Sequence, residues 1–146
     1  ELLHVPWLIR GAGALAGPAR SSALVGLTDL PGMLATWLGK AASQRAFAGN
    51  LLTLVSGEQE TLREALGFRG MQDSAIRTLA GFCRVTSTEQ GAARLYVKPD
   101  DRWEVNDVHD RCPEVLAELR ALAESWPEGD HEPPVELSDA AKFGLG

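Results

Sequence analysis

The stretch that decides the fold runs from Leu95 to Trp126 and reads LYVKPDDRWEVNDVHDRCPEVLAELRALAESW. At its start, apolar and polar residues alternate over residues 95–98, which is the period-two pattern of a strand with one covered face. Pro99 ends this strand because proline offers no backbone N–H to a neighbouring strand. The polar residues of 100–110 then predict a turn between a strand and a helix.

A helix closes this stretch. Asp110 or Cys112 can cap it, Pro113 fits the first turn because its missing N–H has no partner there, and the Glu114 carboxylate suits the helix dipole. The apolar residues of the helix then recur at spacings of four, three and four: Val115, Leu119, Leu122 and Trp126. This single apolar stripe predicts an amphipathic helix that packs on the sheet and stops at Pro127.

Upstream, short apolar runs precede helix signals. Residues 5–9 form a continuous apolar run, typical of a strand covered on both faces, and residues 23–27 predict a second short strand. Thr28 or Asp29 can then cap a helix that ends at Gly39. Its expected inner face is Leu30, Leu34, Trp37 and Leu38. Asn50 similarly predicts the cap of a short helix that ends at Gly57.

Residues 58–97 contain the extended segments of the chain. Residues 74–78 and 81–86 predict strands, and residues 89–91 a hairpin loop before the strand at Leu95. The segment 58–70 suits either a helix or a strand. Residues 127–146 are rich in Pro, Glu, Asp and Gly with little to bury, so we expect a loose tail.

Four segments resemble the C-terminal portion of the sulfatases, members of the alkaline-phosphatase-like superfamily. They occur in the family's order, and they are HVPWLIR at 4–10, LVGLTDLPGML at 24–34, GNLLTLVSG at 49–57 and the stretch from Leu95 to Val108. Two details depart from the family pattern: Pro31 stands one place early, and Pro99 precedes Asp100 where the family has Asp-Pro.

The resemblance implies an α/β fold: terminal β/α elements of a sulfatase-like sheet, followed by a small antiparallel sheet subdomain with a closing helix. Residues 1–57 would be the end of the catalytic domain, 58–126 the antiparallel subdomain with a strand within 58–70, and 127–146 the tail. The parent would be a sulfuric ester hydrolase that uses a divalent cation, usually calcium, and a formylglycine nucleophile, and it would bind a sulfate-ester substrate.

The chain lacks the motifs for that chemistry. Neither Cys83 nor Cys112 starts a Cys-x-Pro-x-x-Arg sequence, no serine does so, and the Asp-His-Gly or Asp-Asn-Gly metal motif is absent. We therefore expect a C-terminal fragment that is inactive alone, with no catalytic, cofactor-binding or metal-ligating residue, whose partner is a missing N-terminal catalytic portion. The alternatives are a fragment of a related phosphodiesterase or phosphonate hydrolase, and a stand-alone binding domain. A fragment should expose a large apolar patch.

Local clusters of polar residues give weaker signals. His4 precedes the first expected strand, and a lone histidine is more often a surface or packing residue. His109 and His131 stand among Asp107, Asp110, Asp130 and Glu132, but their spacing matches no metal motif and predicts a solvated acidic surface. The carboxylates of Asp100, Asp101 and Glu104 are expected to serve as turn and cap groups.

Composition excludes several function classes. The net charge is −6 without a run of Lys or Arg, which disfavours a nucleic-acid partner. The apolar runs fall short of the roughly 20 residues that span a bilayer, and no signal-peptide pattern opens the chain, which begins at Glu1 as if in mid-sequence. Cys83 and Cys112 are expected to remain thiols, although the sequence leaves a bridge between them open, and it leaves the compartment undetermined.

Overall fold

The computed structural model describes residues 7–9, 20–40, 51–86, 92–128 and 133–144. Its centre is a four-stranded antiparallel sheet in the order β1-β2-β3-β4. The strands are β1 (Ala65–Arg69), β2 (Asp73–Thr78), β3 (Gly81–Thr86) and β4 (Ala92–Val97). The mixed α/β class predicted from the sequence is confirmed in this form.

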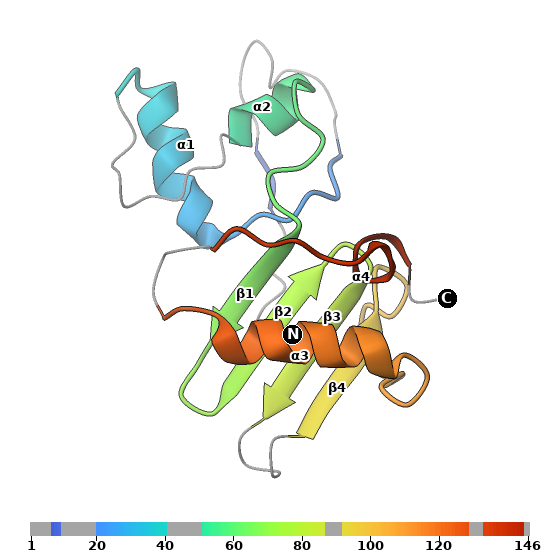
Figure 1. Cartoon of the computed structure of the whole chain (residues 1–146). Helices are drawn as coiled ribbons and strands as arrows, with labels where there is room; N and C mark the ends of the chain where they lie inside the picture. The colour runs from blue at the N-terminus through green and yellow to red at the C-terminus, as the bar shows by residue number, and fades with distance from the viewer. Residues whose placement is uncertain (1–6, 10–19, 41–50, 87–91, 129–132, 145–146) are drawn as a thin grey trace.

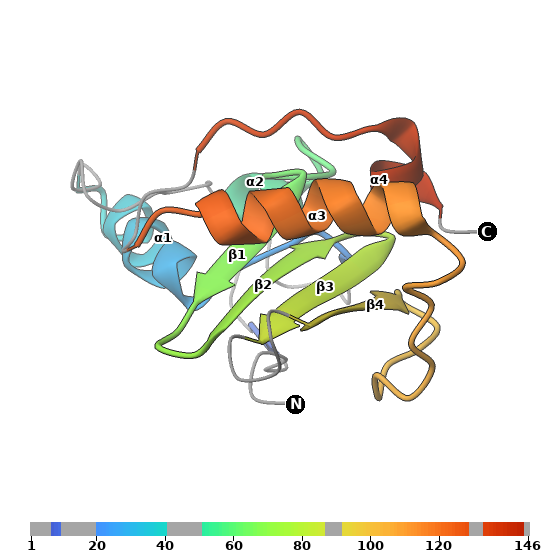
Figure 2. The same ribbon diagram turned by 60° about the horizontal axis from the view of Figure 1, so that its bottom comes forward.

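One helix covers one face of this sheet. Helix α3 (Pro113–Ser125) lies across all four strands in Figures 1 and 2. The predicted stripe faces inward, since Val115, Leu119 and Trp126 are buried and Leu122 packs beside them. Full burial of a leucine such as Leu119 contributes roughly 1.5–3 kcal/mol of hydrophobic stabilisation.

A close approach fixes how α3 ends against the sheet. A Cβ atom on Gly67 of β1 would lie 2.1 Å from the Trp126 ring, so only glycine allows the indole to lie against this strand. Arg69, two residues further along β1, donates hydrogen bonds to the carbonyl oxygens of Glu124 and Trp126, both at 2.9 Å. The C-terminal end of α3 is therefore held on β1 by both packing and hydrogen bonds.

The outer edge of β4 is closed by the chain that follows it. Leu95 N donates to Asp107 Oδ1 at 3.0 Å, and Val108 N donates to Leu95 O at 2.8 Å. Asp101 N donates to Val97 O at 3.0 Å. These contacts use backbone groups that an edge strand would otherwise leave available for pairing.

The N-terminal helices lie beyond the end of the sheet at which β1 begins (Figure 1). A 3-10 turn, η2 (Leu27–Asp29), leads into α1 (Leu30–Trp37), and α2 (Leu51–Ser56) follows. Gly39 and Gly57 have φ angles of 67° and 77°, so the predicted left-handed stops are confirmed. None of the helices in the described ranges combines the length and apolar character needed to cross a bilayer.

Three local predictions differ from the structure. Residues 7–9 and 23–26 form no strand, while residues 5 and 6 lie outside the described ranges. An isolated apolar run cannot form a strand unless a neighbouring strand pairs with its backbone. Asp29 occupies the N-cap position of α1, but its side chain makes no capping hydrogen bond there because it is directed elsewhere.

The C-terminal tail is ordered and is attached to the core at two buried positions. Residues Pro133–Gly144 run back along α3 to helix α4 (Asp139–Phe143), as Figure 2 shows. Leu137 and Ala141 are buried in the same apolar core as Leu119. Composition alone predicted a loose tail because it counts few apolar residues, whereas two well-placed ones suffice to attach this segment.

Candidate functional site

The loop between β4 and α3 contains most of the carboxylates that the sequence singles out. The Asp101 carboxylate accepts hydrogen bonds from Val105 N at 3.0 Å and from Asn106 N at 2.9 Å. These two backbone donors, Val105 first, lower the pKa of Asp101 below its usual value. Asp101 therefore organises the turn, as predicted, and its two oxygens are engaged by the backbone.

Lys98 ties the same loop from the opposite side. Its Nζ donates to Asp101 O at 2.7 Å and to Arg102 O at 3.4 Å, and it lies 3.3 Å from Glu104 Oε1. Glu104 itself has a φ of 58°, an uncommon backbone conformation for a residue with a side chain. The three expected turn carboxylates thus do not converge on a common point, since Asp100 contributes only its carbonyl oxygen, to Arg102 N at 3.0 Å.

The second acidic group surrounds His109. Asp107 Oδ1 accepts hydrogen bonds from Leu95 N and from His109 N. Partial burial raises the pKa of Asp107, but these two N–H donors and His109 outweigh it, so the pKa is lowered overall. His109 Nδ1 lies 3.1 Å from Asp107 Oδ1 in a direction that forms no hydrogen bond, and Nε2 lies 3.0 Å from Asp110 Oδ1.

The part of this acidic group that the structure describes does not form a metal centre. Within the described ranges, His, Cys, Asp and Glu nowhere gather in a set of three or more that could hold an ion. His4, Asp130, His131 and Glu132 lie outside those ranges, so the wider cluster considered from the sequence is only partly placed. In the described part of the group, Asp107 accepts a hydrogen bond from the backbone of β4 at Leu95 N.

The two thiols differ sharply in environment. Both cysteines are described, and neither forms a disulfide. Cys83, on β3 beneath α3, is completely buried, and burial raises the pKa of its thiol to about 12. A thiol that stays protonated at neutral pH is a poor nucleophile and a poor metal ligand.

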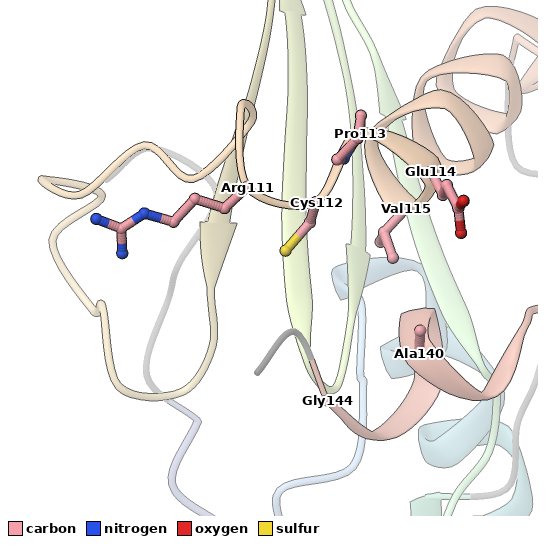
Figure 3. Close-up of a pocket in the computed structure, with 7 residues that line it drawn as sticks. All are labelled: Arg111, Cys112, Pro113, Glu114, Val115, Ala140 and Gly144. Carbon is pink, nitrogen blue, oxygen red and sulfur yellow. The ribbon is translucent and has the colours of Figure 1, made fainter.

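Cys112 lines a shallow cleft of about 470 Å³ between the start of α3 and α4 (Figure 3). The lining residues are Arg111, Cys112, Pro113, Glu114, Val115, Ala140 and Gly144. The charged side chains of Arg111 and Glu114 point to opposite sides and away from the thiol in Figure 3.

A buried ion pair that the sequence analysis did not identify joins the N-terminal segment to the sheet. Arg63, just before β1, donates to both Asp29 oxygens at 2.8 and 2.5 Å and to Leu24 O at 3.1 Å. Asp29 Oδ2 also accepts from Gly26 N at 2.8 Å. Asp29 is completely buried and Arg63 nearly so. The sequence signal for this pair is Asp29 itself, an acidic residue within the apolar run LVGLTDL that is also a suitable helix cap.

The most unusual surface of the molecule is apolar. The residues expected to form the inner face of α1 are instead exposed, and only Gly32 and Met33 of this helix are buried. We define the α1 apolar surface as five exposed side chains: Leu27, Leu30, Leu34, Trp37 and Leu38. Trp37 and Leu38 are 58% and 69% exposed, which is unusual for side chains that belong to one continuous face.

No protein-family model matches the sequence, and no curated protein matches it.

Proposed function

We propose that this chain is the C-terminal portion of a sulfatase-family sulfuric ester hydrolase, in which it acts as scaffold for a catalytic portion carried by other polypeptide. The four sequence segments that resemble the family, in the family's order, support this proposal. An antiparallel sheet closed by a helix at 113–125 is compatible with the architecture that the resemblance implies.

One observation carries the proposal: the uneven distribution of exposed apolar side chains. In the described part of the chain, seven of the eleven large apolar side chains that are exposed lie between Leu8 and Leu38. The sheet and α3, by contrast, enclose a core in which Ile76, Leu95 and Leu119 are completely buried. An apolar surface of this kind marks a contact with further protein.

The residues described here do not fit the cofactors of the family. Each of the carboxylates of Asp101 and Asp107 is engaged by backbone N–H groups, and burial raises the pKa of the Cys83 thiol to about 12, so this thiol stays protonated at neutral pH. We therefore assign the calcium site, the formylglycine nucleophile and the sulfate-ester pocket, as part of the proposal, to the catalytic portion. No catalytic step is attributed to a residue of this chain.

The coding sequence upstream of residue 1 tests the proposal directly. The expected result is a Cys or Ser followed by Pro two places later and by Arg three places after that, together with an Asp-His-Gly or Asp-Asn-Gly motif. A different nucleophile in the same fold would favour the phosphodiesterase or phosphonate hydrolase alternative. A start codon immediately upstream of the Glu1 codon would refute the fragment and favour the stand-alone binding domain.

A second experiment tests the role of the α1 apolar surface. In the joined protein, the double change Leu34→Glu and Trp37→Glu should abolish sulfate release from an aryl sulfate ester, because two charges would have to be buried at the contact. Met71→Glu is the matched control, since Met71 is fully exposed at the β1–β2 turn, and it should leave the rate unchanged. Full activity of the double variant would show that this surface is not the contact. The 146-residue chain alone should release no sulfate above background.

A further inference from the structure

The described contacts of helix α4 and the segment before it are two buried apolar side chains, one buried hydrogen bond and a set of exposed polar pairs. We define the α4 latch as residues 133–144, which run back along α3 and end beside its first turn (Figures 1 and 2). Among the latch side chains that the structure describes, those of Leu137 and Ala141 are buried in the apolar core, and Val135 packs beside them. A five-residue helix has too few internal hydrogen bonds to be stable alone, so these side chains must hold it in place.

The surface contacts of the latch can be exchanged for water. Ser138 N and Oγ donate to the Glu118 carboxylate at 2.8 and 2.6 Å, at an exposed position. Lys142 Nζ lies 2.8 Å from Glu64 Oε1, with side chains that are 25% and 40% exposed. Exposed pairs of this kind contribute little because water solvates the separated partners well.

The one buried hydrogen bond described for the latch, from Thr78 to Ala141, can be replaced by a hydrogen bond within the sheet. Thr78 Oγ1, completely buried, donates to Ala141 O at 2.8 Å. The same hydroxyl lies 3.4 Å from Gly81 O and accepts from Gly81 N at 2.9 Å. If Ala141 moves away, the hydroxyl therefore keeps an acceptor in the β2–β3 turn, and no buried donor is left without a partner.

From these contacts we propose that the α4 latch opens as a local unit while the sheet and α3 stay folded. Opening removes the wall that Ala140 and Gly144 form in the Cys112 cleft, and it vacates the core positions of Leu137 and Ala141. The shallow cleft then becomes an apolar groove that extends from Cys112 to the buried side of α3. This device does not depend on the proposed function.

The alkylation rates of the two cysteines distinguish opening of the latch from unfolding of the whole chain. Cys112 lies in the cleft of which the latch forms one wall, whereas Cys83 lies on β3 under α3 and becomes accessible only when the sheet unfolds. Alkylation of the intact chain with iodoacetamide, followed by mass mapping of each thiol, separates local from global opening. Cys112 should react at a rate that does not depend on low denaturant concentrations, while Cys83 should react only as the chain unfolds.

A pair of leucine variants tests which contacts hold the latch. Leu137→Ala should raise the Cys112 alkylation rate by about tenfold or more, because truncating a buried leucine removes the main apolar contact of the latch, and should leave Cys83 protected. Leu122→Ala is the matched control: Leu122 packs on the core from α3 outside the latch, so its truncation should raise the Cys83 rate, which follows global unfolding, and leave the Cys112 rate unchanged. No rise of the Cys112 rate in Leu137→Ala, or a rise of that rate in Leu122→Ala, would overturn the proposal.

Hydrogen exchange of the unaltered chain tests whether the latch opens separately from the sheet, even if Leu137→Ala fails to fold. The amides of Lys142 and Gly144, bonded to Ser138 O and Ala140 O, should exchange about a hundredfold faster than those of β3. Exchange of the α4 and β3 amides at one common rate would mean that the latch opens only with the whole fold, and would refute the proposal.

Discussion

Replacing Asp29 by asparagine should destabilise this fold more than a change at any surface carboxylate. The Asp29 carboxylate is completely buried and meets the Arg63 guanidinium through two hydrogen bonds. Asparagine keeps the size and one acceptor oxygen but removes the charge, so Arg63 would remain buried without a counter-charge. Loss of one partner of such a pair costs about 3–5 kcal/mol of unfolding free energy.

This magnitude corresponds to a fall of roughly 6–20 °C in melting temperature for a domain of this size. Equilibrium urea unfolding, followed by tryptophan fluorescence and by circular dichroism, measures it directly. The matched control is Asp100→Asn, the same chemical change at an exposed carboxylate, which should stay within about 0.5 kcal/mol of the unaltered chain.

A double variant separates the charge from the packing. Asp29→Leu combined with Arg63→Met removes both charges, so it should be more stable than Asp29→Asn, although Gly26 N and Leu24 O lose their side-chain partners. The reasoning fails if Asp29→Asn costs less than about 0.5 kcal/mol, or if the double variant is no more stable than the single one.

Three further predictions concern the sheet, the helix α3 that covers it, and the loop after β4. Gly67→Ala should cost about 1–3 kcal/mol in urea unfolding, because the new methyl group would overlap the Trp126 ring, and an unchanged midpoint would contradict the packing described here. Leu119→Ala should cost about 2–5 kcal/mol because this side chain is completely buried, and a smaller loss would mean that the core collapses around the cavity. The lowered pKa of Asp101 means that its loop contacts stabilise the fold above the unfolded pKa of 3.8, and that this stabilisation is lost as the pH falls through the lower folded pKa. The amide signal of Val105, which donates to Asp101, should therefore titrate below pH 3.8 in an NMR titration. A midpoint at or above that value would count against these hydrogen bonds.

Much of the fold follows from local sequence signals. The stripe on α3, the left-handed glycines after α1 and α2, and the alternation before Pro99 each act within a few residues, and each has its expected structural counterpart. The strand β1 was ambiguous from its own residues, because LREALGFR suits a helix as well as a strand until β2 pairs with it.

The missed features all depend on distant residues. Asp29 and Arg63 are 34 residues apart, and nothing in either local sequence indicates that the two will meet. The apolar stripe of α1 was expected to face a core, but a stripe shows only that a surface avoids water and does not indicate which protein covers it. The latch shows the converse, because composition cannot count the two apolar residues that fall in the right places.

Because the outer edge of β4 is already hydrogen-bonded, the two edges of the sheet differ in their ability to pair with a further strand. Contacts from Asp101, Asp107 and Val108 occupy backbone groups of Val97 and Leu95, so an incoming strand would have to displace a well-bonded loop before it could pair there. β1, at the other margin, has β2 as its one strand neighbour among the described residues. Strand addition by a neighbouring polypeptide, or by a second molecule during misassembly, would therefore begin at β1 and leave the β4 side unchanged.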